Sequence, residues 1–236
     1  MSMKRLSLLF ICFFTISITL HAVTLKEDTK ICGVCGQPVH VTVVQRLLTG
    51  GSMDLDLRPA PEKRDTLKYQ IQVCKKCNYC WPDIGKERKR EKIAAVLSKP
   101  LNFDDTAALF ARAAEIEIAD NAPSFASFML YMKAAWFMDD LKNKQKSDEY
   151  RKLAIRQMEL YMERDATART TGDNYLAYID ALRRIGEFAK AQKYTEIAAL
   201  YATESILPKI LDFQKKLIEN KDTGRYTVAD VLKEQK

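Results

Sequence analysis

The sequence predicts an α+β fold that is mostly α-helical, with a small antiparallel sheet preceding the helices. Around and between two pairs of cysteines, apolar and polar residues alternate as they do on half-buried strands. From Lys86 onward the apolar residues recur every three or four positions, which is the period of helices that bury one face. The 236 residues are 47% hydrophobic and 29% charged, so the chain is long and apolar enough to bury one or two cores.

The first 25 residues have the pattern of an export signal. Lys4 and Arg5 precede an uncharged run over residues 6–25, within which residues 8–20 are rich in leucine, isoleucine and phenylalanine. We expect a signal peptide over residues 1–22. The alternative is an uncleaved anchor in the inner membrane through residues 6–25, since a run of this length can just span a bilayer. Both interpretations place the folded part outside the cytoplasm, in the periplasm or another extracytoplasmic space.

Residues 30–85 are predicted to form a zinc-ribbon-like domain. Alternating apolar residues predict strands over residues 39–43, 53–57 and 67–73, and the last of these runs directly into a cysteine pair. Asp54 and Asp56 alternate with apolar residues, so we expect them on the solvent-facing side of the second strand.

Two Cys-x-x-Cys pairs give the clearest chemical signal in the chain. Two residues between cysteines allow a tight turn to direct both sulfurs at one tetrahedral ion, and structural zinc sites use such pairs. Gly36 and Asn78 follow the pairs, and these residue types readily adopt the positive φ that lets the chain turn away from the ion. The predicted ligands of one structural zinc ion per chain are Cys32, Cys35, Cys74 and Cys77.

Several alternatives to this ligand set stay open. Cys80 lies three residues after Cys77 and is an alternative ligand, and His40 is another. Outside the cytoplasm, Cys-x-x-Cys pairs can instead close as structural disulfides. A thiol-redox or metal-handling protein using Cys77 and Cys80 is the further alternative, although neither pair opens a helix whose dipole would lower a thiol pKa.

Residues 86–204 are predicted to form a solenoid of tetratricopeptide-like helical hairpins. Gly186 follows an apolar helix end and precedes Phe188, and Ala191 and Ala198 occupy close-packing positions, a pattern typical of a degenerate tetratricopeptide unit. A C-terminal helical extension over residues 205–236 follows. The stretches with a helical stripe of apolar residues are 107–118, 125–136, 150–161, 175–185, 188–201 and 206–217, with a last short helix near 227–234.

The cysteine pairs, taken together with one helix, resemble a bacterial family of uncharacterised proteins. The segments that carry the resemblance are Cys32–Gly36, Val73–Tyr79 and Leu130–Phe137, the last of which contains Ala-Ala-Trp. They are similar to the family called, in words, domain of unknown function twenty-two twenty-five, over about residues 30–201. The resemblance implies a zinc-ribbon-like part joined to tetratricopeptide-like helices, and it implies no activity. Asn78 and Cys80 depart from the family pattern, which has glycine and a small residue there.

The composition argues against an enzyme and against nucleic-acid binding. His40 is the one histidine beyond residue 22, so it would have to serve any Ser-His or Cys-His mechanism, and no glycine-rich phosphate loop is present. The formal net charge is +7, and it falls to +5 without residues 1–22, which carry Lys4 and Arg5 and no acidic residue. Acidic residues interrupt the basic run over residues 86–92, so we expect that run to be a solvated helix face.

We therefore expect an exported, non-enzymatic, zinc-binding adaptor whose helical groove binds a protein or peptide. Stacked helical hairpins leave one face of each first helix on a concave surface. A membrane would be contacted only through an uncleaved N-terminal segment. The groove residues expected on two of these helices are Phe128, Tyr131 and Met138, and Leu176, Asp180 and Arg183.

Overall fold

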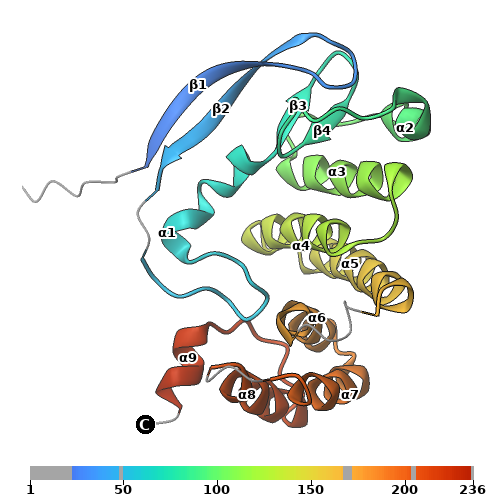
Figure 1. Ribbon diagram of the computed structural model, residues 1–236. Helices are drawn as coiled ribbons and strands as arrows, with labels where there is room; N and C mark the ends of the chain where they lie inside the picture. Colours follow the sequence, from blue (N-terminus) through green and yellow to red (C-terminus); the bar gives the residue numbers. More distant parts are fainter. Residues whose placement is uncertain (1–22, 48–49, 167–171, 203–205, 235–236) are drawn as a thin grey trace, which may run out of the picture.

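The computed structural model describes residues 23–47, 50–166, 172–202 and 206–234. It has an α+β fold that is mostly helical, with small antiparallel sheets preceding the helices, which confirms the predicted fold class. Figure 1 shows the strands at one end of the molecule and the helices layered one after another beyond them. The predicted signal peptide over residues 1–22 lies outside the described residues.

Two hairpins carry the cysteine pairs. β1 (Thr24–Ile31) and β2 (Pro38–Arg46) form an antiparallel hairpin, and the turn between them holds the first pair. β3 (Gln72–Cys74) and β4 (Tyr79–Trp81) form a shorter antiparallel hairpin around the second pair. β2 confirms the strand predicted over residues 39–43. The sequence pattern gives no sign of β1, because almost every residue of that strand is exposed and only Leu25 and Ile31 are apolar.

The strand predicted over residues 53–57 is wrong. This segment makes a tight turn in which the Leu57 amide donates to the Asp54 carbonyl at 3.1 Å, and Leu57 has a φ of 66°. Asp54 instead makes an isolated antiparallel bridge with Thr227, far along the chain. The alternation of this segment therefore reflects a buried turn that packs against other elements on both sides.

The strand predicted over residues 67–73 is also mostly wrong. Leu67–Gln70 is a 3-10 turn, and only the end of the segment belongs to β3. Leu67 and Ile71 are both buried, and their spacing of four residues fits a helical turn as well as an alternating strand. Short apolar patterns of this kind do not distinguish the two conformations.

The helices predicted from the 3.6-residue period are all present. The joint predicted at Gly186 is confirmed: Gly186 has a φ of 85°, and the Glu187 amide donates to the Leu182 carbonyl at 2.9 Å, as in a Schellman helix end. The helices are α1 (Pro61–Arg64), α2 (Arg90–Leu97), α3 (Thr106–Asp120), α4 (Phe125–Asp140), α5 (Lys144–Arg164), α6 (Gly172–Arg184), α7 (Phe188–Ala199), α8 (Leu207–Glu219) and α9 (Val228–Lys233).

Each helix from α2 to α8 packs against its neighbours in sequence, which gives the stack seen in Figure 1. Alanines allow the central helices to approach closely, since Ala113 of α3, Ala134 of α4 and Ala154 of α5 are fully buried. Side-chain caps mark where these helices begin: Asp105 accepts from the Ala108 amide at the start of α3, and Ser124 forms a capping box with Ser127 at the start of α4. The short connections keep consecutive helices in contact.

The strands and the helices share one hydrophobic core. Buried residues from Cys32 to Val231 form one continuous cluster. The loop before α1 also reaches the C-terminal segment, where the Leu55 amide donates to the Tyr226 carbonyl at 2.9 Å (Figure 1). The boundaries predicted near residues 85 and 204 therefore mark changes in the sequence pattern. In the structure, the segments on either side of each boundary belong to the same hydrophobic core.

Candidate metal centre

The two hairpin turns bring four cysteines together. The sulfur of Cys32 lies 3.7 Å from that of Cys77, and the sulfur of Cys35 lies 3.6 Å from that of Cys74. All four sulfurs lie within 4.8 Å of one another. These are the four residues predicted as ligands, and in the described part of the chain they form a group that could hold a metal ion.

The spacing of the sulfurs fits a tetrahedral ion. Four thiolates at about 2.3 Å from a zinc ion stand about 3.8 Å from one another, which is close to the two shortest distances found here. Cys32, Cys74 and Cys77 are buried and Cys35 is partly exposed, so protein surrounds most of the group. A complete set of four protein ligands is typical of structural sites, because a catalytic metal keeps an open position.

The four thiols affect one another's ionisation. Burial raises the pKa of Cys32 and the pKa of Cys77. Burial opposes ionisation of Cys35 as well, but hydrogen bonds from the Gln37 backbone amide and from the neighbouring cysteines outweigh it and lower the pKa of that thiol. Four thiolates at this spacing repel one another, so a bound cation would be needed to keep all four deprotonated.

Each cysteine turn ends in a residue with positive φ, as the sequence predicts. Gly36 has a φ of 71° and Asn78 a φ of 60°, and their amides donate to the carbonyls of Cys32 and Cys74 at 2.9 Å. The Asn78 side chain also donates to the Leu97 carbonyl at 3.0 Å, a bond that glycine could not make. Asparagine therefore combines the turn with a contact to the end of α2.

Cys80 and His40, the alternative ligands, lie outside the sulfur cluster. Cys80 is buried on β4 with its sulfur 3.8 Å from the Asn78 carbonyl oxygen, and burial raises the pKa of its thiol to about 12. His40 is exposed on β2, where its Nδ1 lies 3.1 Å from the Thr29 hydroxyl. A raised pKa makes Cys80 a poor nucleophile, and this argues against a redox-active pair of Cys77 with Cys80.

A close backbone contact fixes the first cysteine turn to the loop after β4. The Gly33 amide donates to the Ile84 carbonyl at 2.9 Å. A side chain at Gly33 would meet the Lys86 carbonyl oxygen at 2.3 Å, so only glycine fits this position. The hydroxyl of buried Tyr79 donates to the same carbonyl at 2.9 Å. The sequence pattern alone gives no sign that the site requires glycine at position 33.

Arg88 joins the same region to α3. Its buried guanidinium lies 2.6 Å from the Glu117 carboxylate, 2.5 Å from the Asp120 carboxylate and 4.3 Å from the centre of the Trp81 ring. The expectation that residues 86–92 form a solvated face is therefore wrong for Arg88. A charge run in a sequence does not reveal which of its members meets buried acids on another helix.

The six residues predicted to line a groove are buried, so an open groove formed by them is wrong. The C-terminal segment explains part of this burial: Arg183 pairs with Asp180 at 2.6 Å and donates to the carbonyls of Asp222 and Gly224 at 2.6 and 2.8 Å. The exposed fractions are 0% for Phe128, 5% for Tyr131, 6% for Met138, 8% for Leu176, 2% for Asp180 and 0% for Arg183.

Buried ion pairs connect the loop before α1 to the helices, and the sequence pattern gives no sign of them. The fully buried carboxylate of Asp56 accepts from the Trp136 indole at 2.7 Å and from Arg184 at 3.3 Å. Asp139 accepts from Arg184 at 2.9 Å and from Arg151 at 2.5 Å. Burial raises the pKa of Asp56. Burial also opposes ionisation of Asp139, but the hydrogen bond from Arg151 and the nearby positive charges hold its pKa at about 2.

The expected solvent-facing position of Asp54 and Asp56 is thus wrong. Asp54 is 1% exposed and pairs with Arg64 at 2.6 Å, and Asp56 is 0% exposed. Arg58, two residues further, is also buried and pairs with Asp140 at the end of α4. Three charged residues in a short turn are buried together because each has a partner on another element.

Comparisons of the chain with protein-family models, with curated proteins and with solved structures found no match. The resemblance to the domain of unknown function twenty-two twenty-five therefore stays a prediction from the cysteine pairs and the Ala-Ala-Trp helix. None of the helices in the described part of the chain combines the length and apolar character that crossing a bilayer requires.

Proposed function

We propose that the four cysteines hold one structural zinc ion, and that the protein acts by binding another molecule and not by catalysis. The observation that carries this proposal is the mutual approach of four sulfurs to within 4.8 Å. A tetrahedral set of four sulfurs suits zinc or an iron–sulfur cluster, and a single ion with four ligands matches the 3.6 and 3.7 Å sulfur distances. In this role the ion joins the β1–β2 hairpin to the β3–β4 hairpin.

Two disulfides are the second candidate, because Cys32 lies nearest Cys77 and Cys35 lies nearest Cys74. Each pair of sulfurs would have to approach from more than 3.5 Å to about 2.05 Å. In a disulfide each sulfur bonds to one other sulfur, whereas every sulfur here lies near the other three. The arrangement therefore favours a shared ion over two separate bonds.

Zinc content tests the first proposal. Mature protein purified under reducing conditions is expected to contain about one zinc and no iron per chain by elemental analysis. A strong chelator should remove the ion and lower the melting temperature, because the binding free energy of a structural metal contributes to folding. Metal-free protein with two intramolecular disulfides after native export would contradict the zinc proposal and support the disulfide candidate.

We place the partner-binding role on a cleft between α3 and α5. The cleft has a volume of about 320 Å³, and its lining includes Arg112, Tyr131, Lys146, Tyr150 and Leu153. Leu153 is 41% exposed and Lys146 is exposed, so they offer apolar area and a positive charge above the largely buried tyrosine rings, which suits a protein or peptide ligand. If residues 1–22 are an export signal, that partner is another extracytoplasmic protein.

A photo-crosslinking amino acid at position 153 tests this placement. Leu153 is 41% exposed and lines the cleft, so the probe is expected to capture a partner protein in the native envelope. The matched control carries the same probe at Leu200, which is 78% exposed at the end of α7 and away from the cleft. Equal capture from both positions, or from neither, would count against the cleft as the binding site.

A further inference from the structure

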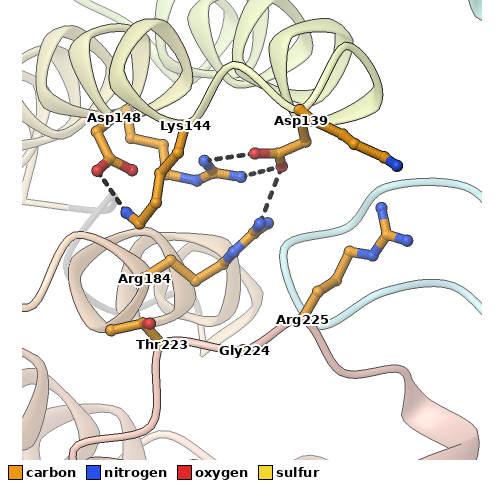
Figure 2. A pocket seen from close by; sticks show the side chains of 9 residues that line it. Asp139, Lys144, Asp148, Arg184, Thr223, Gly224 and Arg225 are labelled. Carbon is orange, nitrogen blue, oxygen red and sulfur yellow. Dashed lines mark hydrogen bonds and ion pairs between the residues drawn. The ribbon is translucent and has the colours of Figure 1, made fainter.

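A second cleft, separate from the cysteines, lies where the end of α4 and the beginning of α5 meet α6 and the segment before α9. Its volume is about 320 Å³. Figure 2 shows Arg184 reaching up toward Asp139, with Thr223 and Gly224 below it and Arg225 on the other side. Its lining contains five cations and two acids: Lys142, Lys144, Arg151, Arg184 and Arg225 with Asp139 and Asp148.

The two acids of the cleft already have cationic partners. Asp148 pairs with Lys144 at 2.5 Å. Asp139 pairs with both Arg151 and Arg184, and Figure 2 draws its contact with Arg184 as a dashed line. These pairs hold the two arginines in place before any ligand arrives, so their guanidinium groups form a preorganised wall.

Among the described residues, one of the five cations has no ion pair, and another shares its acid with a second arginine. Lys142 has no ion pair in the part of the chain that the structure describes. Arg225 lies 3.7 Å from Asp54, whose carboxylate is already paired with Arg64 at 2.6 Å. Asp56 lies 3.3 Å from Arg184, and together with Asp139 it offsets the positive charges of Arg151 and Arg184. The cleft is therefore left with two positive charges.

One further feature suits a phosphate-type anion at this position. α5 is 21 residues long and begins at the cleft with Lys144, so the positive end of its dipole lies there.

We propose that this cleft binds a doubly charged phosphate group, with Lys142 and Arg225 as its direct contacts and Arg151 and Arg184 as the charged wall behind it. Two charges on the ligand match the two uncompensated cations, and guanidinium groups suit the several oxygens of a phosphate. A monovalent carboxylate would neutralise only one of them. This inference does not depend on the metal centre or on the cleft between α3 and α5.

Titration with inorganic phosphate at pH 7.5 and constant ionic strength tests the proposal in the full mature protein. Saturable binding is expected in phosphorus-31 spectra and by calorimetry, with acetate binding at least tenfold more weakly. Binding that does not saturate, or acetate binding as strong as phosphate binding, would overturn it.

Variants at exposed positions locate the site. Lys142 has a φ of 55°, so Lys142→Asn removes the charge while keeping a residue that tolerates this conformation. It is expected to weaken phosphate binding about tenfold, and Arg225→Gln about as much. Lys221→Asn is the matched control, because Lys221 is an exposed lysine with a φ of 52° that does not line the cleft.

Arg90→Gln serves as the matched control for Arg225→Gln, since Arg90 is exposed at the start of α2. Both controls are expected to change phosphate affinity less than twofold. Equal losses in the controls and the cleft variants would show that phosphate responds only to the overall charge, and the proposed site would be wrong. Melting curves of all four variants check that they are folded.

Discussion

Replacing Cys74 with serine is expected to abolish stoichiometric zinc binding and to destabilise the N-terminal hairpins. Cys74 ends β3, is 2% exposed and lies 3.6 Å from the sulfur of Cys35. Serine offers a poor zinc ligand, so three thiolates would remain to hold the ion. Structural zinc sites contribute roughly 10–16 kcal/mol in small zinc-dependent peptides, so the loss of one ligand should cost several kcal/mol here. Elemental analysis and thermal unfolding measure both effects.

Cys80→Ser is the matched control for this change. Cys80 is equally buried and lies in the next strand, but its sulfur is outside the four-cysteine group. We expect this variant to keep about one zinc per chain, with at most a small loss of stability from changing a buried thiol. If Cys80→Ser released the metal and Cys74→Ser did not, the assignment of the second pair would have to be exchanged.

The cysteine group could be predicted because its chemistry is local in sequence. Two residues between cysteines and a following Gly36 or Asn78 specify a turn that directs two sulfurs the same way. The helices could be predicted for a similar reason: stripes such as the one ending at Ile185 repeat over several turns, and Gly186 marks the helix end. These signals depend on neighbours within a few residues.

The errors concern residues whose conformation depends on distant partners. Asp54 and Asp56 alternate like residues on a strand, but they meet Arg64 and Trp136 in a buried turn. Arg183 has the spacing of an exposed helix face, yet the segment before α9 covers it. One sequence does not show which acid will meet which arginine over separations of more than a hundred residues, as between Asp56 and Arg184.

These same contacts connect the loop before α1 to the helices. Residues 30–85 place Asp56 beside Trp136 of α4 and Arg184 of α6, and Arg58 beside Asp140 at the end of α4. Removing that region would leave Arg184 and the Trp136 indole without their buried acceptor. A buried donor or charge without a partner costs free energy, so the helical stack uses the loop before α1 as part of its own core.

Asp56→Ala is accordingly expected to be among the most destabilising single changes in the chain. It removes the acceptor of the Trp136 indole and one of the two acids that face Arg184, at a position that is 0% exposed. Breaking a buried ion pair by deleting one partner costs about 3–5 kcal/mol, so the melting temperature should fall by about 10 °C. Thermal unfolding followed by circular dichroism measures the change.

Two further variants test whether the loss of these contacts causes the fall in melting temperature. Glu62→Ala removes an exposed acid from the neighbouring α1 and is expected to shift the melting temperature by less than about 2 °C. Asp56→Asn keeps an oxygen that can accept from Trp136, so it should cost clearly less than Asp56→Ala. An Asp56→Ala protein as stable as the Glu62→Ala protein would show that the helices do not need this carboxylate. The loop before α1 would then be a covering of the helical stack and not a part of its core.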